Sequence, residues 1–499
     1  MTVTLAIDAG TTGVRTLAVD EHGRPGAGAY REFPQHFPRS GWVEHDADEI
    51  WSATLATLHE VLAALEGDGK SVAAVGITNQ RETTVVWDRA TDEPRHRAIV
   101  WQDRRTAARC DELRTGGHEA LVRARTGLVL DPYFSATKLE WLFTEGGVDP
   151  DPNLAFGTVD SWLLWRLTGG RSGGVHATDT TNASRTLLFD LDTLDWSDDL
   201  LALFGIPRSC LPEIRPSRGR FAMTDPACAA GAHVPVSGIA GDQQAALFGQ
   251  ACFEPGMTKN TYGTGSFVLM NVGATRPDPV EGLLTTVAWT GADEVAYALE
   301  GAIFVTGAAI QWLRDGLGVI EDAAETGPLA ASVPDTGGVV MVPALTGLGS
   351  PWWDPYARGA VLGITRGTGR AHLARAVVEA MAWQTRDVID AMAAASGRSV
   401  TELRVDGGAS AMDLLCQFQA DVLGVTVRRP VVKETTALGA AYLAGIAEGV
   451  WSSPADAAAA WQEEASFQPA MAADEVTRRR DEWRRGLDRA RGWAREPAD

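Results

Sequence analysis

The sequence predicts an α/β protein with two domains. Segments patterned as strands alternate with segments of helical spacing along the whole chain. The chain has 499 residues, more than one hydrophobic core usually serves, which favours two domains of roughly 250 residues each. A strand, Gly/Thr turn, strand unit begins the chain and recurs near its middle. We therefore expect domains at residues 1–250 and 251–499 that share one topology and face each other across a nucleotide-binding cleft.

The first half opens with a strand, a tight turn and a second strand. The turn has the sequence DAGTTG, and a helix with regular apolar spacing follows it, with Asp46 or Asp48 as the N-cap. An apolar run typical of a buried strand comes next, and then a short strand. The expected elements are strands at Thr2–Ile7, Val14–Val19, Val72–Thr78 and Thr83–Trp87 and a helix at Asp48–Leu65.

The second half repeats the strand, turn, strand order after a break at Gly249–Pro255. Its first turn has the sequence YGTG, and a later turn, DGGAS, leads from a strand into a helix. Helical spacing after Trp451 predicts a helix with a packing or surface role. The remaining expected elements are strands at Met257–Thr261, Ser266–Asn271, Val339–Val342 and Leu403–Val405 and helices at Gly301–Leu317 and His372–Ala395.

Composition and charge exclude several classes of function. The chain carries 44 Lys+Arg against 65 Asp+Glu, a net charge of -21, which disfavours nucleic acids and anionic membranes as partners. No apolar run approaches the roughly 20 residues that span a bilayer, and the first residues show no secretion signal. The five cysteines are widely spaced without a CxxC pair, which indicates reduced thiols. We expect a cytoplasmic protein with no nucleic acid partner and no stable membrane association.

The first Gly/Thr turn, DAGTTGVR, is a candidate phosphate site. Its glycines, among them Gly13, allow successive backbone amides to point into one concavity for anionic oxygens. Thr11 and Thr12 add hydroxyl donors, Arg15 adds positive charge, and Asp8 ends a strand where it could hold a hydrated Mg²⁺. The alternative is a hairpin in which the Asp and Thr side chains only satisfy turn amides.

The turns YGTGS and DGGAS are weaker signals of the same kind. Each places the amides at the start of a helix near a phosphate or ribose, although close packing of a helix on a strand would explain either one. Three such turns spread over both halves favour nucleotide binding. No P-loop or dinucleotide fingerprint follows a strand.

A candidate acceptor site combines polar residues from separate segments. Asp242 and Gln243 stand where an apolar strand meets a helix, so Asp242 is either a helix cap or a base that accepts the proton of an attacking alcohol. Arg81 and Glu82 follow the strand VAAVGIT, and they either form a solvated turn or bind neighbouring hydroxyl groups of a polyol.

Three aromatic residues are candidates for the wall of that site. Tyr133 is either a core or lid residue or a hydroxyl donor to a small diol. Trp101 and Phe267 are large apolar side chains that belong to the core or, if they oppose each other, pack on the CH face of a polyol.

At these residues the sequence resembles the FGGY carbohydrate kinase family of the actin-like ATPase superfamily, and within it the members that phosphorylate glycerol. The resemblance runs from Ile7 to about Val450. The motifs that carry it are DAGTTGVR, TNQRET, WQDRRTA, SGIAGDQQAALFG, KNTYGTGSF, LEGAIFVTGAAIQWLRD, TGLGSPWWDPYARGAVLGITRG, TRDV, RVDGGAS and ETTALGAAYLAG.

The resemblance implies two RNase H-like domains that close over a nucleotide cleft and transfer the γ-phosphate of ATP to glycerol. It implies Asp242 as catalytic base, and Asp8 and Asp242 as residues that hold Mg²⁺ largely through water. Glycerol would contact Arg81, Glu82, Trp101, Tyr133, Asp242, Gln243 and Phe267. The nucleotide would contact Thr11, Thr12, Gly13, Arg15, Thr264, Gly307, Gln311, Gly408 and Met412, the last of which replaces an asparagine found in some members.

Two alternatives stay open at this point. The chain could phosphorylate a four- or five-carbon polyol or sugar, although the compact Trp101 and Phe267 pair favours a triol. It could instead be an actin-like ATPase that acts on protein partners, which would leave the polar residues of the acceptor site unexplained. For either kinase we expect a homo-oligomer, a dimer or tetramer.

Overall fold

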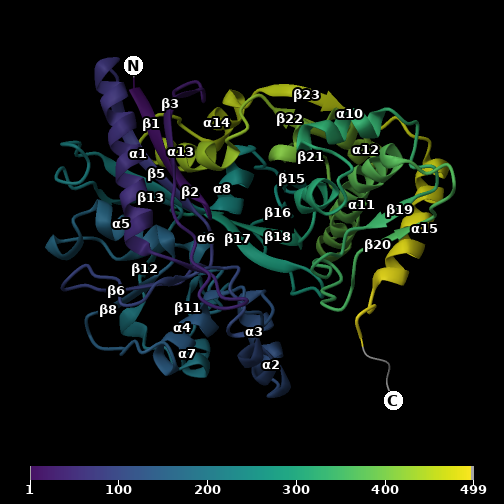
Figure 1. Cartoon of the computed structure of the whole chain (residues 1–499). Helices are drawn as coiled ribbons and strands as arrows, with labels where there is room; N and C mark the ends of the chain where they lie inside the picture. Colours follow the sequence, from purple (N-terminus) through teal and green to yellow (C-terminus); the bar gives the residue numbers. More distant parts are fainter. Residues whose placement is uncertain (1, 496–499) are drawn as a thin grey trace.

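The computed structural model describes residues 2–495, which form two α/β lobes (Figure 1). The first lobe is built on a six-stranded sheet with the order β13-β14-β5-β1-β2-β3. β1 pairs antiparallel with β2 and parallel with β5, and β5 pairs parallel with β14. The strands are β1 (Thr2–Ala9), β2 (Gly13–Asp20), β3 (Pro25–Glu32), β5 (Ser71–Asn79), β13 (Arg218–Met223) and β14 (Pro235–Gly241).

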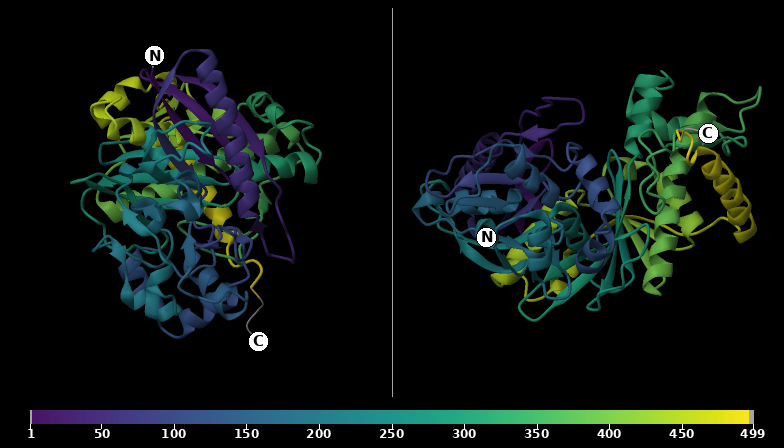
Figure 2. Two further views of the ribbon diagram at one scale, coloured as in Figure 1. Left: turned by 90° about the vertical axis from the view of Figure 1, so that its left-hand side faces the viewer. Right: turned by 90° about the horizontal axis from the view of Figure 1, so that it is seen from below.

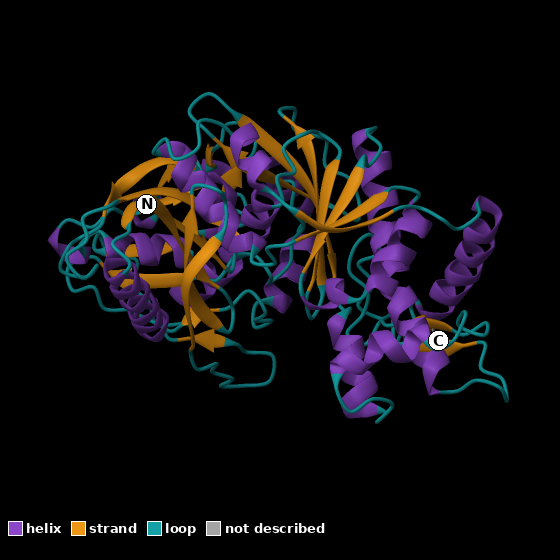
Figure 3. Cartoon of the chain, turned by 90° about the horizontal axis from the view of Figure 1, so that it is seen from above, coloured by secondary structure: helices purple, strands orange, loops and turns teal. Residues whose placement is uncertain are grey.

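The second lobe is built on a seven-stranded sheet with the order β17-β18-β16-β15-β21-β22-β23. Its central part repeats the first sheet, because β15 pairs antiparallel with β16 and parallel with β21, which pairs parallel with β22. The strands of the two sheets form separate groups flanked by helices (Figure 3). The strands are β15 (Met257–Tyr262), β16 (Ser266–Gly273), β17 (Leu284–Thr290), β18 (Val295–Ile303), β21 (Glu402–Asp406), β22 (Thr426–Pro430) and β23 (Glu463–Phe467).

Helices and short strands complete both lobes. The first lobe adds α1 (Ala47–Gly67), β4 (Glu44–His45), β6 (Val85–Asp88), β7 (Ala98–Ile99), α2 (Ala107–Thr115), α3 (Glu119–Thr126), α4 (Ser135–Thr144), β8 (Leu154–Gly157), α5 (Val159–Leu167), β9 (Ala177–Asp179), α6 (Thr180–Ala183), β10 (Phe189–Asp190), β11 (Asp195–Trp196), α7 (Asp198–Phe204), β12 (Glu213–Arg215) and α8 (Asp242–Gly249). The second adds α9 (Gly307–Gln311), α10 (Thr326–Ala331), β19 (Val340–Val342), β20 (Ala360–Leu362), α11 (Arg370–Ser396), α12 (Asp413–Leu423), α13 (Thr435–Ala447), α14 (Pro454–Ala460) and α15 (Ala473–Ala490).

One helix crosses from the second lobe to the first. α13 follows the strands of the second sheet in sequence but packs against β1, β5 and β14 of the first sheet and against α8. In Figure 1 α13 lies beside the purple strands at the start of the chain, and Figure 2 gives two further views of the lobes. One buried cluster accordingly contains Ala6 of the first sheet, Leu269 of the second and Leu443 of α13. The hydrophobic core is therefore continuous between the lobes.

Most expected elements are confirmed, and the first helix has Asp46 as its N-cap. The helix expected at Gly301–Leu317 is wrong in its first third, because β18 continues to Ile303 and α9 begins at Gly307. The apolar residues at the start of that stretch are buried on both faces of a strand within the sheet. Periodicity alone does not distinguish such a continuous apolar run from a buried helix. The strand expected at Thr83–Trp87 begins two residues later, at Val85. In the part of the chain described here, no helix is long and apolar enough to cross a membrane.

Candidate active site

Arg81 stands at the centre of the candidate site, on the loop that follows β5. Its side chain is almost completely buried, so the solvated-turn interpretation of this segment is wrong. The side-chain Nε lies 3.2 Å from Oδ1 of Asp242, and Nη2 donates to the Tyr133 hydroxyl at 3.3 Å. The guanidinium carbon lies 5.8 Å from the centre of the Phe267 ring. The fold thus gathers four predicted acceptor residues that are far apart in sequence.

Asp242 begins α8, but it is not the helix cap, because Gly241 occupies the cap position. Oδ1 of Asp242 accepts a hydrogen bond from the Gln243 amide at 2.7 Å. The Asp242 side chain is 30% exposed, whereas the neighbouring acidic side chain of Glu82 is 1% exposed. A carboxylate fixed at a helix start and open to a small molecule is suited to accept a proton.

The aromatic residues join the acceptor site to the first Gly/Thr turn. Trp101 and Tyr133 pack edge to face with ring centroids 5.7 Å apart. The indole Nε1 of Trp101 donates to Oγ1 of Thr11 at 3.0 Å. Both rings are half-buried, so each can pack on a ligand as well as on protein. The structure thereby connects a predicted substrate residue with a predicted nucleotide residue.

Gln243 is held by a lysine that sequence reasoning missed. Its Oε1 accepts a hydrogen bond from Nζ of Lys259 on β15, which also donates to the Thr261 hydroxyl at 3.0 Å. Burial lowers the pKa of Lys259 to about 8, and the carboxylates of Asp406 and Asp242 oppose that lowering. Lys259 therefore brings positive charge from the second lobe close to the acceptor site.

Asp8 and Asp242 are two carboxylates that lie close enough to influence each other. Desolvation and the nearby Asp242 raise the pKa of Asp8 to about 7, and Arg15 opposes that rise. Mutual repulsion of this kind is relieved by a cation between the carboxylates. Among the described residues no group of three or more His, Cys, Asp and Glu side chains forms a dedicated metal cage. The carboxylate pair fits Mg²⁺, which commonly uses one or two carboxylates, waters and substrate phosphates.

The first Gly/Thr turn joins β1 to β2, where the Gly10 amide bonds to the Gly13 carbonyl at 3.0 Å. A side chain at Gly13 would collide with the Arg31 carbonyl at 2.5 Å, so only glycine fits there. Thr12 is exposed, and half-exposed Arg15 faces Glu434 at 3.4 Å. The turn therefore presents hydroxyl and guanidinium groups that a phosphate can reach.

The remaining predicted nucleotide residues gather on the second lobe. Backbone amides of residues 306–308 bond to the carbonyls of Gly263 and Thr264, so Thr264 lies against Gly307 at the start of α9. Gly408 and Gln311 are exposed. Met412 is half-buried and lies against Gly327 in α10. Within residues 2–495 no hydrogen bond connects this group to the first Gly/Thr turn.

Sequence reasoning also missed two buried charged residues beside Arg81. Glu300 on β18 accepts from both terminal nitrogens of Arg81, at 2.5 and 3.1 Å. Arg185 donates to Glu300 at 2.9 Å and to Glu82 at 2.7 Å. Burial raises the pKa of Glu82, and the two arginines oppose that rise. Glu300 stands in the motif LEGAIF, but nothing in its local pattern indicates which residue it contacts.

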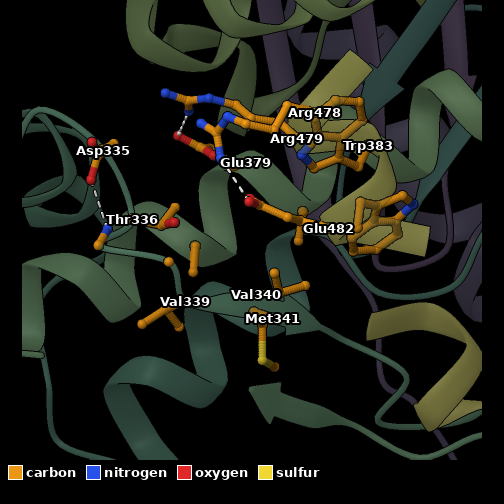
Figure 4. Close-up of a pocket in the computed structure, with 15 residues that line it drawn as sticks. Asp335, Thr336, Val339, Val340, Met341, Glu379, Trp383, Arg478, Arg479 and Glu482 are labelled. Carbon is orange, nitrogen blue, oxygen red and sulfur yellow. Dashed lines mark hydrogen bonds and ion pairs between the residues drawn. The ribbon is translucent and has the colours of Figure 1, made fainter. Parts of the chain in front are cut away.

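A cavity of about 330 Å³ lies elsewhere in the second lobe, between β19, α11 and α15 (Figure 4). None of the predicted site residues lines it. On its wall, Glu379 accepts hydrogen bonds from Arg375 at 2.8 Å and from Arg479 at 3.4 Å. This cavity is therefore separate from the candidate active site.

The site thus lies between two lobes of matching topology, each with a Gly/Thr turn, and pairs the partly exposed carboxylate of Asp242 with the buried guanidinium group of Arg81. The chain belongs to the FGGY family of carbohydrate kinases. Residues 3–249 match the N-terminal domain of that family and residues 258–448 match its C-terminal domain.

Full-length relatives support the same placement. A glycerol kinase of Dechloromonas aromatica is 55% identical over 502 aligned positions that cover 98% of each chain. The crystal structure of a Plasmodium falciparum glycerol kinase with ADP is 33% identical, superposes with a TM-score of 0.92 and covers 98% of both chains. A xylulose kinase structure from Brucella ovis is 25% identical with a TM-score of 0.87 over 97% of this chain and 98% of its own.

Proposed function

We propose that this protein transfers the γ-phosphate of ATP to a terminal hydroxyl of glycerol and releases ADP and sn-glycerol 3-phosphate. The observation that carries the proposal is the cluster of Arg81, Tyr133 and Asp242, with the Trp101 ring packed on Tyr133 and the Phe267 ring facing Arg81. Its polar atoms suit adjacent hydroxyl groups, and its aromatic faces suit the CH groups of a short carbon chain. The identity of 55% to a glycerol kinase over nearly the full length supports the same acceptor.

In this proposal the residues act by positioning and by moving one proton. Arg81, Glu82, Tyr133 and Gln243 bind the glycerol hydroxyl groups, and Trp101 and Phe267 pack on the carbon chain. Asp242 accepts the proton of the attacking hydroxyl as its oxygen forms a bond to the γ-phosphorus and the bond to the β,γ-bridging oxygen breaks. ADP leaves with that bridging oxygen, so the phosphoryl group passes directly between the substrates.

In this proposal ATP contacts both lobes. Thr11, Thr12, Gly13 and Arg15 would hold phosphate oxygens from the first lobe, and Thr264, Gly307, Gln311, Gly408 and Met412 would hold the nucleotide from the second. Asp8 and Asp242 would hold Mg²⁺, which when bound neutralises phosphate charge. We also expect the chain to form a dimer or tetramer, which stays a prediction.

The runner-up is phosphorylation of a longer polyol or sugar, since a xylulose kinase shares the fold. The two acceptors make different demands on the site. A five-carbon sugar needs room beyond the Trp101 and Phe267 rings, whereas a triol does not. Substrate selectivity therefore separates the two proposals better than any measurement of ATP binding.

The deciding experiment measures ADP release from MgATP with glycerol, erythritol, pentoses or pentuloses. We expect selective turnover with glycerol and a loss of about 10²- to 10⁴-fold in kcat for Asp242→Asn, the range typical of a lost general base. Asp198→Asn is the matched control, because Asp198 also begins a helix but is exposed and, within residues 2–495, pairs only with Arg208. Turnover selective for a pentulose would replace the substrate, and no stimulation by any polyol would favour an ATPase with protein partners.

A further inference from the structure

Four charged side chains form a buried ring at the acceptor site, which shares Arg81 and Glu82 with it. Arg81 and Glu82 come from the loop after β5, Arg185 from the turn after α6, and Glu300 from β18 of the other lobe. All four side chains are at most 2% exposed. Glu300 bridges the two arginines, Arg185 reaches Glu82 at 2.7 Å, and Arg81 closes the ring 3.8 Å from Glu82. We call these residues the buried ring.

The donors of Arg81 are almost fully used within this arrangement. A guanidinium group has two N–H bonds on each terminal nitrogen and one on Nε. The terminal nitrogens of Arg81 donate to both oxygens of Glu300, to Gln244 at 3.2 Å and to Tyr133 at 3.3 Å. The shortest contact with Asp242 is made by Nε, at 3.2 Å. Glu300 thus binds both terminal nitrogens of Arg81, whereas Asp242 lies nearest to Nε.

Asp242 and Glu300 therefore compete for one guanidinium group. A bidentate pair of Arg with a carboxylate is the strongest arrangement available to either acid. If Glu300 were absent, the free prongs of Arg81 would turn to the nearest carboxylate, which is Asp242. A base held in that way is a poorer proton acceptor, and Arg81 is then misplaced for the acceptor hydroxyl.

We propose that Glu300 is a positioning residue that reaches across from the second lobe to hold Arg81 and thereby keeps Asp242 available to the acceptor alcohol. This inference rests on the proposed glycerol kinase activity and adds a specific role for the opposite lobe. Arg185 supports Glu300 from its other side. Within residues 2–495, the carboxylates that accept hydrogen bonds from Arg185 are those of Glu300 and Glu82, while the buried Nη1 of Arg185 has no partner there.

The charge state of Glu300 agrees with this role. Burial alone would raise the pKa of Glu300, but Arg185 and Arg81 outweigh burial and lower the pKa to about 2. The two arginines therefore favour the anionic form of Glu300. Replacing Glu300 by glutamine removes that charge while it keeps the size and one acceptor oxygen, so it isolates the electrostatic part of the contact.

The test compares Glu300→Gln and Glu300→Asp with the wild-type chain in glycerol-dependent ADP release. We expect Glu300→Gln to lower kcat/KM for glycerol by about 10- to 100-fold, the loss typical of a charged hydrogen bond, with KM for ATP changed by less than about twofold. Glu300→Asp keeps the charge and should recover part of the loss. Titration calorimetry of glycerol without nucleotide should show the same ranking of affinities.

Glu379→Gln is the matched control. Glu379 is also a buried glutamate held by two arginines in the second lobe, but it lies on the wall of the separate cavity (Figure 4). We expect it to change neither kinetic constant for glycerol. Glu300→Gln behaving like Glu379→Gln, or losing affinity for ATP and glycerol alike, would overturn the proposal.

Two further arms make the outcome decisive. If the Glu300 variants do not fold, as judged by circular dichroism and thermal unfolding, Arg185→Lys replaces them. That variant keeps the charge but cannot donate to Glu82 and Glu300 with the same geometry, so a several-fold loss in kcat/KM for glycerol alone supports the proposal, and unchanged glycerol kinetics overturn it. A wild-type chain that is inactive with glycerol would overturn the proposed function itself. Loss of activity in a variant alone would not, because the wild type would still be active.

Discussion

At the scale of single residues, a buried carboxyl group lies in the polar interior next to the loop that carries Arg81. Asp160 on α5 is completely buried and accepts hydrogen bonds from the hydroxyls of Thr158 and Thr178. Asn79 ends β5 two residues before Arg81, and its side-chain Nδ2 lies 3.5 Å from Oδ1 of Asp160. Desolvation and the nearby Asp179 raise the pKa of Asp160 to about 7. Ionisation of Asp160 therefore opposes folding near neutral pH.

This shift predicts how stability depends on pH. A carboxyl group whose pKa is raised in the folded state contributes stability that is present below its unfolded pKa, about 4, and lost as the pH rises through the folded value of about 7. The free energy of unfolding of the wild type minus that of Asp160→Asn should therefore fall by up to ~1.4 kcal/mol per pH unit between pH 5.5 and 7 and level off above that, as measured by urea unfolding.

The same series with Asp387→Asn provides the comparison. Asp387 accepts a hydrogen bond from the Trp483 indole at 2.8 Å, and burial raises its pKa to about 6. Its curve should level off about one pH unit earlier. Parallel wild-type and Asp160→Asn curves across this range would mean that Asp160 is not protonated in the folded state.

At the scale of elements, α8 and α13 approach each other more closely than side chains would permit. A Cβ atom on Gly439 of α13 would lie 1.8 Å from the Ala245 carbonyl oxygen of α8, and one on Gly249 would lie 1.9 Å from the Thr435 carbonyl oxygen. The two glycines therefore let the backbones touch. This contact explains why the segments SGIAGDQQAALFG and ETTALGAAYLAG are rich in glycine and alanine.

A methyl group placed in this contact should separate the two helices. We expect Gly439→Ala to lower the free energy of unfolding by ~1–3 kcal/mol through overpacking, despite the better helix propensity of alanine. Gly67→Ala is the control, because Gly67 ends α1 and an added Cβ would meet nothing within 4 Å. That change should stabilise the chain by up to ~1 kcal/mol. Equal effects of the two substitutions in thermal unfolding would contradict the close contact.

At the scale of the whole molecule, the two lobes are tied together by exchange of parts. α13 belongs in sequence to the second half but covers β1, β5 and β14 of the first sheet. α8 belongs to the first half but packs on β15, β16 and β17 of the second. Arg81 and Glu300 add an ion pair between residues 219 positions apart. Neither sheet can therefore lose its packing without disturbing the other.

The exchange predicts cooperative unfolding of both lobes. Differential scanning calorimetry should show one transition whose calorimetric and van't Hoff enthalpies agree, although many two-domain chains of this length give two. A fragment of residues 1–250 should not fold alone, because it leaves the α13-facing side of its sheet bare. Two resolved transitions, or a folded fragment with native circular dichroism, would show that the lobes are independent.

The sequence predicts a substantial part of the site because some signals are local. The turn DAGTTG, the polar pair Arg81 and Glu82, and Asp242 at a helix start are each visible within a few residues. Arg81, Tyr133, Asp242 and Phe267 do lie together. Their roles in binding glycerol and ATP, and the domain boundary at residue 250, stay predictions, and the expected helix at Gly301 is wrong where a buried strand imitates helical spacing.

By itself, then, the sequence determined the α/β class, the repeated topology, the strands around the first two Gly/Thr turns and the long helices α1 and α11, because periodicity and turn chemistry act between near neighbours. Its motifs indicated the family. Only the tertiary structure decided that Gly241 and not Asp242 caps α8, that α13 crosses to the first sheet, and that Glu300 holds Arg81. Those features depend on which segments meet in three dimensions. The contact made by the buried Glu300 on β18 depends on the fold, which brings the guanidinium group of Arg81 from the other lobe to within 2.5 Å.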